Sequence, residues 1–312
     1  MTLRKVFSTG LALFCFTTSV MAADPAILRI GYQKGSISLL LAKEHGLLEK
    51  RFPDTTVQWI EFPAGPQMLE AMNVNALDVG STGDIAPLFA QAAGADLVYI
   101  GSEPPKPQAE TILVKADSPL KGIADLKGKK VAFQRGSSSH NLILRALNKT
   151  GLSYQDIQAM NLPPSNARAA FEQGSVDAWA IWEPYASLAL SQGNVRVLAN
   201  GEGLNLSGPV YTARRSYAQD NGAFVHALLD ELTAAEALTR SQREDTLKVM
   251  KKYMGLPDGV IASYLDNRPP SPISPIDANI IAAQQMTADL FYQNKLLPKP
   301  LDVGSAVWRE AE

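Results

Sequence analysis

The sequence predicts an α/β protein whose two similar lobes face each other across a cleft. Three observations support this prediction. Short apolar runs typical of buried strands alternate with helical segments, which is the pattern of a parallel sheet covered by helices. An internal repeat with an offset near one hundred residues links the first third of the chain to the second. A helix-rich segment then completes the chain.

The first hundred residues contain the elements of one lobe. Strands are expected at residues 27–32, 57–62, 76–80 and 97–101, and helices at residues 39–50, 67–73 and 85–93. This alternation predicts a Rossmann-like lobe, in which ligands bind at the loops that follow the carboxyl ends of the strands.

The internal repeat predicts a second lobe of the same kind. Residues 29–38 read closely against residues 130–139, and residues 77–84 read against residues 176–183. Chance similarity between two α/β segments is the alternative, but the repeat keeps its order and spacing over several elements. The offset is too long for a solenoid, so two lobes across a cleft fit it better.

The chain is expected to cross between the lobes twice, through hinge strands at residues 110–115 and 209–214. Two such strands would let the lobes close by rotation. Helices that follow the return crossing are expected to pack on the first lobe. The predicted organisation is a signal peptide at 1–22, a first lobe at 23–112 and 213–312, and a second lobe at 113–212.

The N-terminus has the pattern of a secretory signal peptide. Arg4 and Lys5 precede an apolar run at residues 6–20, and cleavage is expected after Ala22. A membrane anchor is the alternative, but the apolar run is shorter than the roughly 20 residues of a spanning helix. The single cysteine, Cys15, lies within the signal, so the exported, periplasmic chain would have no thiol, no disulfide and no cysteine chemistry.

Composition and motifs argue against several functions. The 29 Lys and Arg residues nearly balance the 31 Asp and Glu residues, which gives no indication of nucleic acid as a partner. The three histidines, His45, His140 and His226, have no spacing typical of a catalytic triad or a metal site. Nucleotide-binding glycine motifs are absent from the sequence. We therefore expect no catalytic residues, no metal and no cofactor.

Three consecutive serines mark the candidate site. Ser137, Ser138 and Ser139 follow a predicted strand and a turn at Gly136, where a helix should begin. Free amides and the positive end of the helix dipole can hold an anion there without a formal charge. The alternative is that one serine is merely an N-cap. The repeat favours a binding role, because it pairs this segment with a similar one at residues 35–38.

A binding cleft is the function that remains, with polar groups from both lobes. Trp182 is expected beside the cleft. Asp84 and Glu183 suit an anion poorly, so they are expected to cap the helices that begin at Ile85 and Pro184, or to bind a cationic group on a zwitterionic ligand. The candidate ligand-binding residues are Gln33, Ser81, Thr82, Gly83, Asp84, Ser137, Ser138, Ser139, His140, Trp182 and Glu183.

Several segments resemble the aliphatic sulfonate-binding proteins of bacterial ABC importers. The likeness runs from about residue 26 nearly to the C-terminus. The segments that carry it are residues 31–35, 62–70, 80–84, 136–141, 177–182 and 237–244.

The resemblance implies a type II periplasmic binding protein fold and a receptor that delivers alkanesulfonates to a membrane permease, and through it to an ATPase, for sulfur supply. It also implies a monomer and a sulfonate held mainly by uncharged donors. The positions that match those donors are Gln33, Thr82, Gly83, Ser137, Ser138, Ser139 and Trp182. Two alternatives stay open: a receptor for taurine or another oxyanion such as a sulfate ester, and an enzyme similar to thiamine-pyrimidine synthases.

Overall fold

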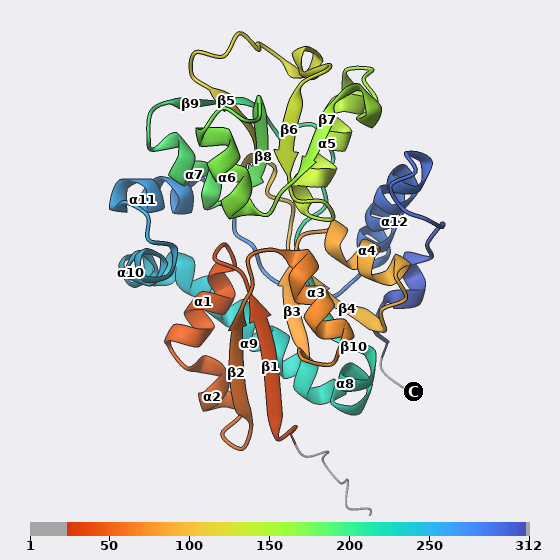
Figure 1. The fold of residues 1–312 in the computed structure, drawn as a ribbon. Coiled ribbons are helices and arrows are strands. Elements are labelled where there is room, and N and C mark those ends of the chain that lie inside the picture. The colour runs from red at the N-terminus through yellow and green to blue at the C-terminus, as the bar shows by residue number, and fades with distance from the viewer. Residues whose placement is uncertain (1–23, 310–312) are drawn as a thin grey trace, which may run out of the picture.

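The computed structural model describes residues 24–309, and the predicted signal peptide and its cleavage site lie outside this range. Two five-stranded sheets, each flanked by helices, form two lobes stacked one above the other (Figure 1). The predicted α/β fold with two lobes is therefore confirmed.

The first sheet has the strand order β2-β1-β3-β10-β4. Strand β1 pairs parallel with β2 and β3, and β10 is antiparallel to both β3 and β4. Helices α1 (Ile37–Glu44), α2 (Leu47–Arg51), α3 (Gly65–Asn73) and α4 (Ile85–Ala92) follow these strands in the chain. The strands are β1 (Ile27–Tyr32), β2 (Thr56–Glu61), β3 (Val79–Thr82), β4 (Leu97–Ser102) and β10 (Val210–Arg214).

The second sheet repeats this plan with the order β7-β6-β8-β5-β9. Here β5 is the strand that runs antiparallel to its neighbours, β8 and β9. The helices are α5 (Ser138–Lys149), α6 (Pro164–Glu172) and α7 (Tyr185–Leu190). The strands are β5 (Glu110–Lys115), β6 (Lys130–Phe133), β7 (Gln158–Asn161), β8 (Ala178–Trp182) and β9 (Val195–Asn200). The shared strand order explains the internal repeat of the sequence.

The two crossings lie a few residues away from the segments expected to form hinge strands. Strand β10 pairs along its whole length within the first sheet, and β5 pairs in the same way within the second. The chain changes lobe at residues 103–109 and 201–209, where Glu103 N donates to Pro209 O (2.8 Å) and Gly201 N donates to Pro107 O (2.9 Å). We therefore move the lobe limits to these two segments, outside both strands.

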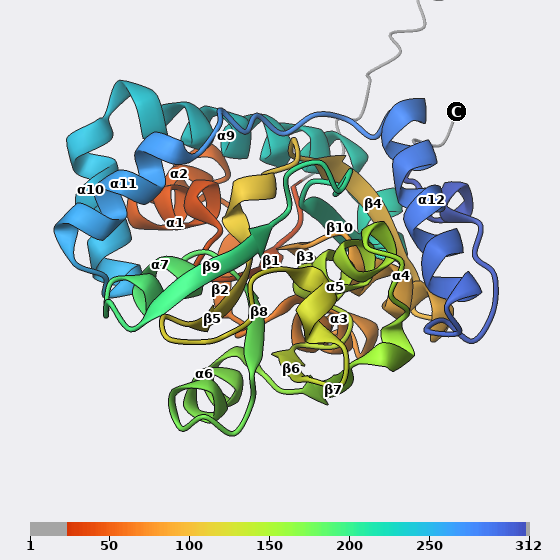
Figure 2. The same ribbon diagram turned by 90° about the horizontal axis from the view of Figure 1, so that it is seen from above.

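The C-terminal helices extend the first lobe and also reach the second. Helices α8 (Arg215–Asp220), α9 (Gly222–Ser241) and α10 (Arg243–Met254) join β1, α1 and α2 in one apolar core. Helix α11 (Asp258–Asn267) contacts α7, and the segment that follows it runs along α9 toward α12 (Ala278–Gln293) (Figure 2). Helix α12 packs with α4 through a core that includes Leu144 of α5.

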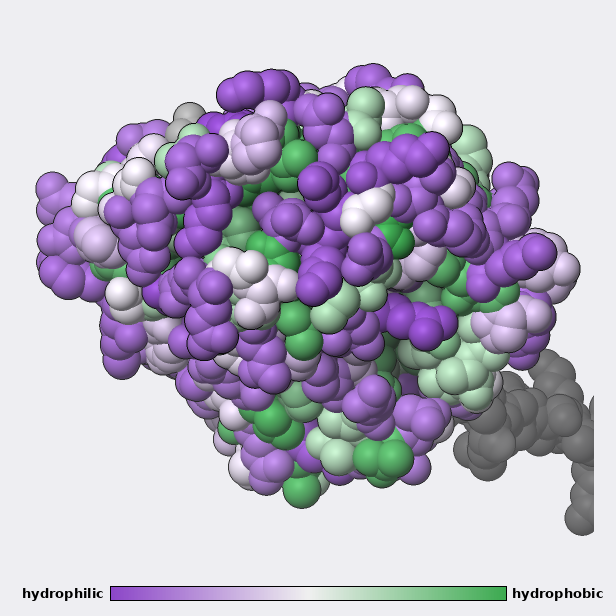
Figure 3. All heavy atoms as spheres, turned by 45° about the horizontal axis from the view of Figure 1, so that its top comes forward, coloured by the Kyte–Doolittle hydropathy of each residue, from purple (hydrophilic) through white to green (hydrophobic). Residues whose placement is uncertain are grey.

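One face of the molecule is mostly polar, with apolar side chains scattered among the polar ones (Figure 3). Among residues 24–309, no helix combines the length and the apolar character that crossing a membrane requires.

Candidate functional site

A pocket of about 120 Å³ lies between the lobes, where the strands of both sheets end. Nine of the eleven predicted residues line it, and Ser139 and His140 do not. Further residues of the first lobe complete the wall together with residues from the two crossings, from the start of β5 and from α11. These further lining residues are Gly35, Ser36, Gly65, Ala86, Lys106, Ala109, Glu110, Leu206, Ser207, Pro209 and Tyr264.

The first lobe contributes the end of β3 and the starts of two helices. The Gln33 amide donates to Ser81 O (3.2 Å), and Thr82 Oγ1 donates to Gly83 O (3.0 Å). Helix α1 begins after Ser36 and α4 begins after Asp84, so both positive helix ends belong to this wall. The wall thus combines hydroxyl groups, backbone amides and helix dipoles.

The second lobe contributes the start of α5. Gly136, with φ +77°, turns the chain from β6 into this helix, and Ser137 is its N-cap residue. Ser137 Oγ donates to Gln134 O (2.7 Å) and shares a hydrogen bond with Ser139 Oγ (2.9 Å). Ser138, the first helical residue, also lines the pocket.

Ser139 and His140 lie behind the pocket wall, which corrects the expectation that they face the cleft. Ser139 is fully buried, and the His140 ring stacks on Phe133 with ring centroids 5.2 Å apart. Burial lowers the pKa of His140 to about 3, and its Nδ1 accepts from Gly136 N (3.3 Å). His140 is therefore neutral, and it stabilises the turn that precedes α5.

The lobes touch around the pocket, so the structure is closed. A Cβ placed on Gly83 would lie 3.0 Å from Ser138 Cβ, and one on Gly35 would lie 2.8 Å from Glu183 O. Asn141 Nδ2 of α5 donates to Asp84 Oδ2 of the first lobe (2.6 Å). A side chain at position 35 would clash with the Glu183 backbone, and one at position 83 would require Ser138 to shift by a few tenths of an ångström.

Three carboxyl groups line the same pocket: Asp84 is buried, and Glu110 and Glu183 are half-buried. Burial raises the pKa of Asp84 to about 7, although a hydrogen bond from Asn141 opposes it. Burial also raises the pKa of Glu110 to about 8, and repulsion from Asp84 and Glu183 adds to the effect. Burial raises the pKa of Glu183, whose carboxylate accepts from Ser187 N (3.1 Å) and Ser187 Oγ (2.8 Å) near the start of α7. This last contact matches the expected helix-capping role of Glu183.

The lining cation Lys106 does not offer a free positive charge. It pairs with Glu103, and Arg268 nearby forms two hydrogen bonds to Glu236 (2.6 and 2.8 Å). An anion in the pocket would therefore depend on hydroxyls, amides and helix ends. Among residues 24–309, no group of His, Asp and Glu side chains is arranged to hold a metal ion.

The sequence prediction missed Lys106, Glu110 and Tyr264. Residues 110–115 read as an apolar strand after their first residue, and this pattern gave no sign that Glu110 faces a pocket. Tyr264 reaches the site from α11, about 180 residues from β3 in the chain, and local patterns carry no signal for such a contact.

Comparisons with known proteins match this architecture. Residues 35–243 match the family described as NMT1/THI5 like. An aliphatic sulfonates-binding protein of Escherichia coli (strain K12) is 59% identical over 99% of this chain and 98% of its own length. This chain belongs to the family of aliphatic sulfonate-binding proteins.

Solved structures of this family superpose closely on the present fold. The alkanesulfonate-binding protein SsuA from Xanthomonas axonopodis pv. citri, bound to MOPS, has a TM-score of 0.91 and 55% identity, and the match covers 92% of this chain and 100% of that one. The periplasmic aliphatic sulphonate binding protein SsuA from Escherichia coli has a TM-score of 0.85 and 61% identity, over 93% and 94%. These relatives are named as binding proteins, and the fold predicted from the resemblance is confirmed.

Proposed function

We propose that this chain is a periplasmic receptor that captures aliphatic sulfonates and delivers them to an ABC permease and its ATPase for sulfur acquisition. The observation that carries the proposal is the convergence of helix starts and hydroxyl groups from both lobes on one pocket. Such donors suit the three oxygens of a sulfonate, which bears one delocalised negative charge. The names of the close relatives support the same ligand class.

Closure of the lobes would couple binding to delivery. The donors of α4 belong to the first lobe and those of α5 to the second, so a ligand that touches both binds the closed form better than the open one. Such a ligand shifts the population toward closure. The closed surface would then be the form that the permease recognises, with the receptor acting as a monomer after its signal peptide is removed at Ala22.

The proposed ligand contacts follow the geometry of the pocket. Gln33, Thr82 and Gly83 would hold the sulfonate from the first lobe, and Ser137 and Ser138 from the second. Trp182 would cover the first carbon atoms of the ligand, because it is half-buried at the pocket with Tyr185 against its edge (centroids 6.1 Å apart).

Calorimetric titration of the purified mature chain tests the proposal. We expect ethanesulfonate and longer alkanesulfonates to bind near neutral pH, and nitrate and amino acids without a sulfonate group to give no heat. Binding of nitrate or of such an amino acid, together with no response to any sulfonate, would contradict the proposal.

A receptor for aminosulfonates such as taurine is the second candidate. The carboxyl groups of Asp84, Glu110 and Glu183 favour it, because they could pair with a cationic nitrogen beside the sulfonate. Competition between taurine and ethanesulfonate, which differ by one amino group, separates the two candidates. A clear preference for taurine would favour the second.

A further inference from the structure

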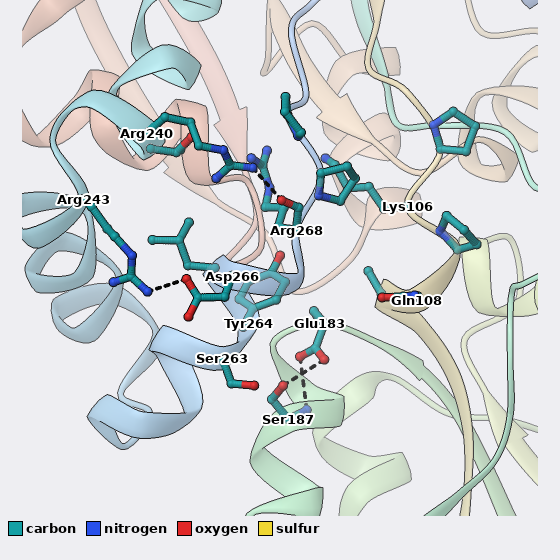
Figure 4. Close-up of a pocket in the computed structure, with 17 residues that line it drawn as sticks. Lys106, Gln108, Glu183, Ser187, Arg240, Arg243, Ser263, Tyr264, Asp266 and Arg268 are labelled. Carbon is teal, nitrogen blue, oxygen red and sulfur yellow. Dashed lines mark hydrogen bonds and ion pairs between the residues drawn. The ribbon is translucent and has the colours of Figure 1, made fainter.

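The pocket between the lobes has one positively charged side chain, Lys106, among the described residues that line it. The acidic side chains on the same wall are those of Asp84, Glu110 and Glu183. Lys106 and Glu183 also line a larger neighbouring cavity, and Lys106 lies across this cavity from Glu183 (Figure 4). The partner of this one lysine therefore decides whether the pocket offers a free positive charge to an anion.

Glu103 neutralises this lysine although it does not itself line the pocket. Its buried carboxylate forms an ion pair with Lys106, three residues further along the first crossing. Tyr211 Oη of β10 donates to the same carboxylate (2.9 Å), and Glu103 N donates to Pro209 O of the second crossing (2.8 Å). Glu103 is thus fixed through its backbone and its side chain, and the two crossings hold the ion pair in place.

The charges next to this pair are balanced as well. Arg268 Nη2 lies 3.7 Å from Glu103 Oε2, and the Arg268 guanidinium donates two hydrogen bonds to Glu236 (2.6 and 2.8 Å). Positive and negative charges therefore alternate along one chain of contacts, which runs through Lys106, Glu103, Arg268 and Glu236. These four charges add up to zero, so the network brings no net positive charge to the pocket.

A wall without a free cation distinguishes anions by their charge. Uncharged donors and helix ends can hold one delocalised negative charge. A dianion of similar size loses far more hydration on burial, and its second charge would meet the carboxyl groups of Glu110 and Glu183. Methanesulfonate and sulfate differ in this way, because sulfate has an oxygen atom in place of the methyl group and one more negative charge.

We propose that Glu103 sets the charge selectivity of the receptor: by pairing with Lys106, it makes the pocket accept sulfonate monoanions and exclude dianions such as sulfate. The inference rests on the proposed function, because it assumes that the anion occupies this pocket. Glu103 acts through Lys106 and is therefore a positioning residue. Its removal should widen the range of anions that bind, whereas the loss of a residue with a purely structural role would weaken the binding of all anions alike.

Glu103→Gln removes the charge and keeps an oxygen that can accept from Tyr211. Burial lowers the pKa of Lys106, and attraction to Glu103 opposes this effect. In the variant, a bound anion takes over this role, and a dianion attracts the lysine about twice as strongly as a monoanion does. The affinity for sulfate relative to methanesulfonate should therefore rise about tenfold or more.

Calorimetry with sulfate and methanesulfonate tests the inference, near neutral pH and in a buffer without sulfonate groups. The ratio of the two affinities is measured for the natural chain, for Glu103→Gln, and for the double variant that adds Lys106→Gln. We expect the ratio to favour methanesulfonate in the natural chain, to shift toward sulfate in Glu103→Gln, and to return in the double variant, where both charges of the pair are gone. Glu202→Gln, which removes an exposed charge of the second crossing outside the pocket, is the matched control and should leave the ratio unchanged.

The outcomes separate this inference from the proposed function. If the natural chain binds no sulfonate, the proposed function fails. If it binds sulfate as well as methanesulfonate, or if the ratio stays the same in Glu103→Gln, the inference fails while the function stands. Denaturant unfolding shows whether each variant folds. If Glu103→Gln does not fold, Glu103→Asp, which draws the carboxylate away from Lys106 by one methylene group, should shift the ratio in the same direction, and an unchanged ratio there would equally overturn the inference.

Discussion

Gly35→Ala tests whether the closed arrangement of the lobes is the form that binds ligand. The new Cβ would lie 2.8 Å from the carbonyl oxygen of Glu183 in the opposite lobe, closer than Cβ atoms approach other heavy atoms in proteins. A backbone oxygen cannot rotate out of the way, so the lobes must stay slightly apart. Overpacking of this kind costs about 1–3 kcal/mol, which corresponds to a roughly 5- to 150-fold weaker affinity.

The same change should not destabilise the ligand-free chain. Gly35 does not have a left-handed conformation, so alanine fits its backbone, and the contact with Glu183 exists only when the lobes meet. Alanine should leave the free energy of unfolding unchanged or raise it by about 0.4–1 kcal/mol. Calorimetry with ethanesulfonate and with octanesulfonate gives the affinities, and denaturant unfolding without ligand gives the stability.

The control for this experiment is Gly122→Ala. Gly122 has extended backbone and no heavy atom within 4 Å of a new Cβ, so the variant should bind like the natural chain. Because the methyl group added in Gly35→Ala points at Glu183, the affinities for both sulfonates should fall by the same factor. Unchanged affinity in Gly35→Ala would refute the idea that the closed lobes form the binding state.

Three further predictions follow from the pocket. Ser138→Ala should weaken ethanesulfonate binding about tenfold by calorimetry. Ser139→Ala should lower the free energy of unfolding by about 1 kcal/mol and change the affinity less than about threefold. Equal effects of the two variants on affinity would contradict the placement of Ser138 at the pocket and of Ser139 behind its wall. The pKa of Asp84 is raised to about 7, so between about pH 4 and 7 the folded chain holds a proton that the unfolded chain has lost, and the free energy of unfolding falls by up to about 4 kcal/mol as pH rises. Denaturant unfolding of Asp84→Asn should lack this part of the pH dependence of stability, and an unaltered pH dependence would contradict the role of Asp84. The pKa of Glu110, about 8, predicts that sulfonate affinity falls above this pH, because a carboxylate then forms beside the anion. Glu110→Gln should flatten the pH dependence of the affinity between pH 6 and 9. If this variant still loses affinity above pH 8, another group is responsible.

The internal repeat made most of the fold accessible from the sequence. Matching segments about one hundred residues apart became two sheets with the same strand order. The repeat did not show that each sheet also needs an antiparallel strand next to a crossing. Strands β5 and β10 take that place. Residues 110–115 and 209–214 therefore read as crossings, although β5 belongs to the second sheet and β10 to the first.

Helix phase explains which part of the site prediction was wrong. Ser139 and His140 lie three or four residues before Leu142, Ile143 and Leu144, so they share the buried face of α5. This helical spacing is present in the sequence, but the three consecutive serines suggested that all of them face the same side. Lys106, Glu110 and Tyr264 had no comparable signal, because they meet only after the chain has crossed twice and α11 has packed against the second lobe.

A crystal structure of the complex with ethanesulfonate would show directly whether both lobes hold the sulfonate. We expect closed lobes, with the sulfonate oxygens about 2.7–3.2 Å from donors at the start of α4 and from donors at the start of α5. A sulfonate held by one lobe alone, or paired with Lys106 in place of Ser138 and Gly83, would contradict it.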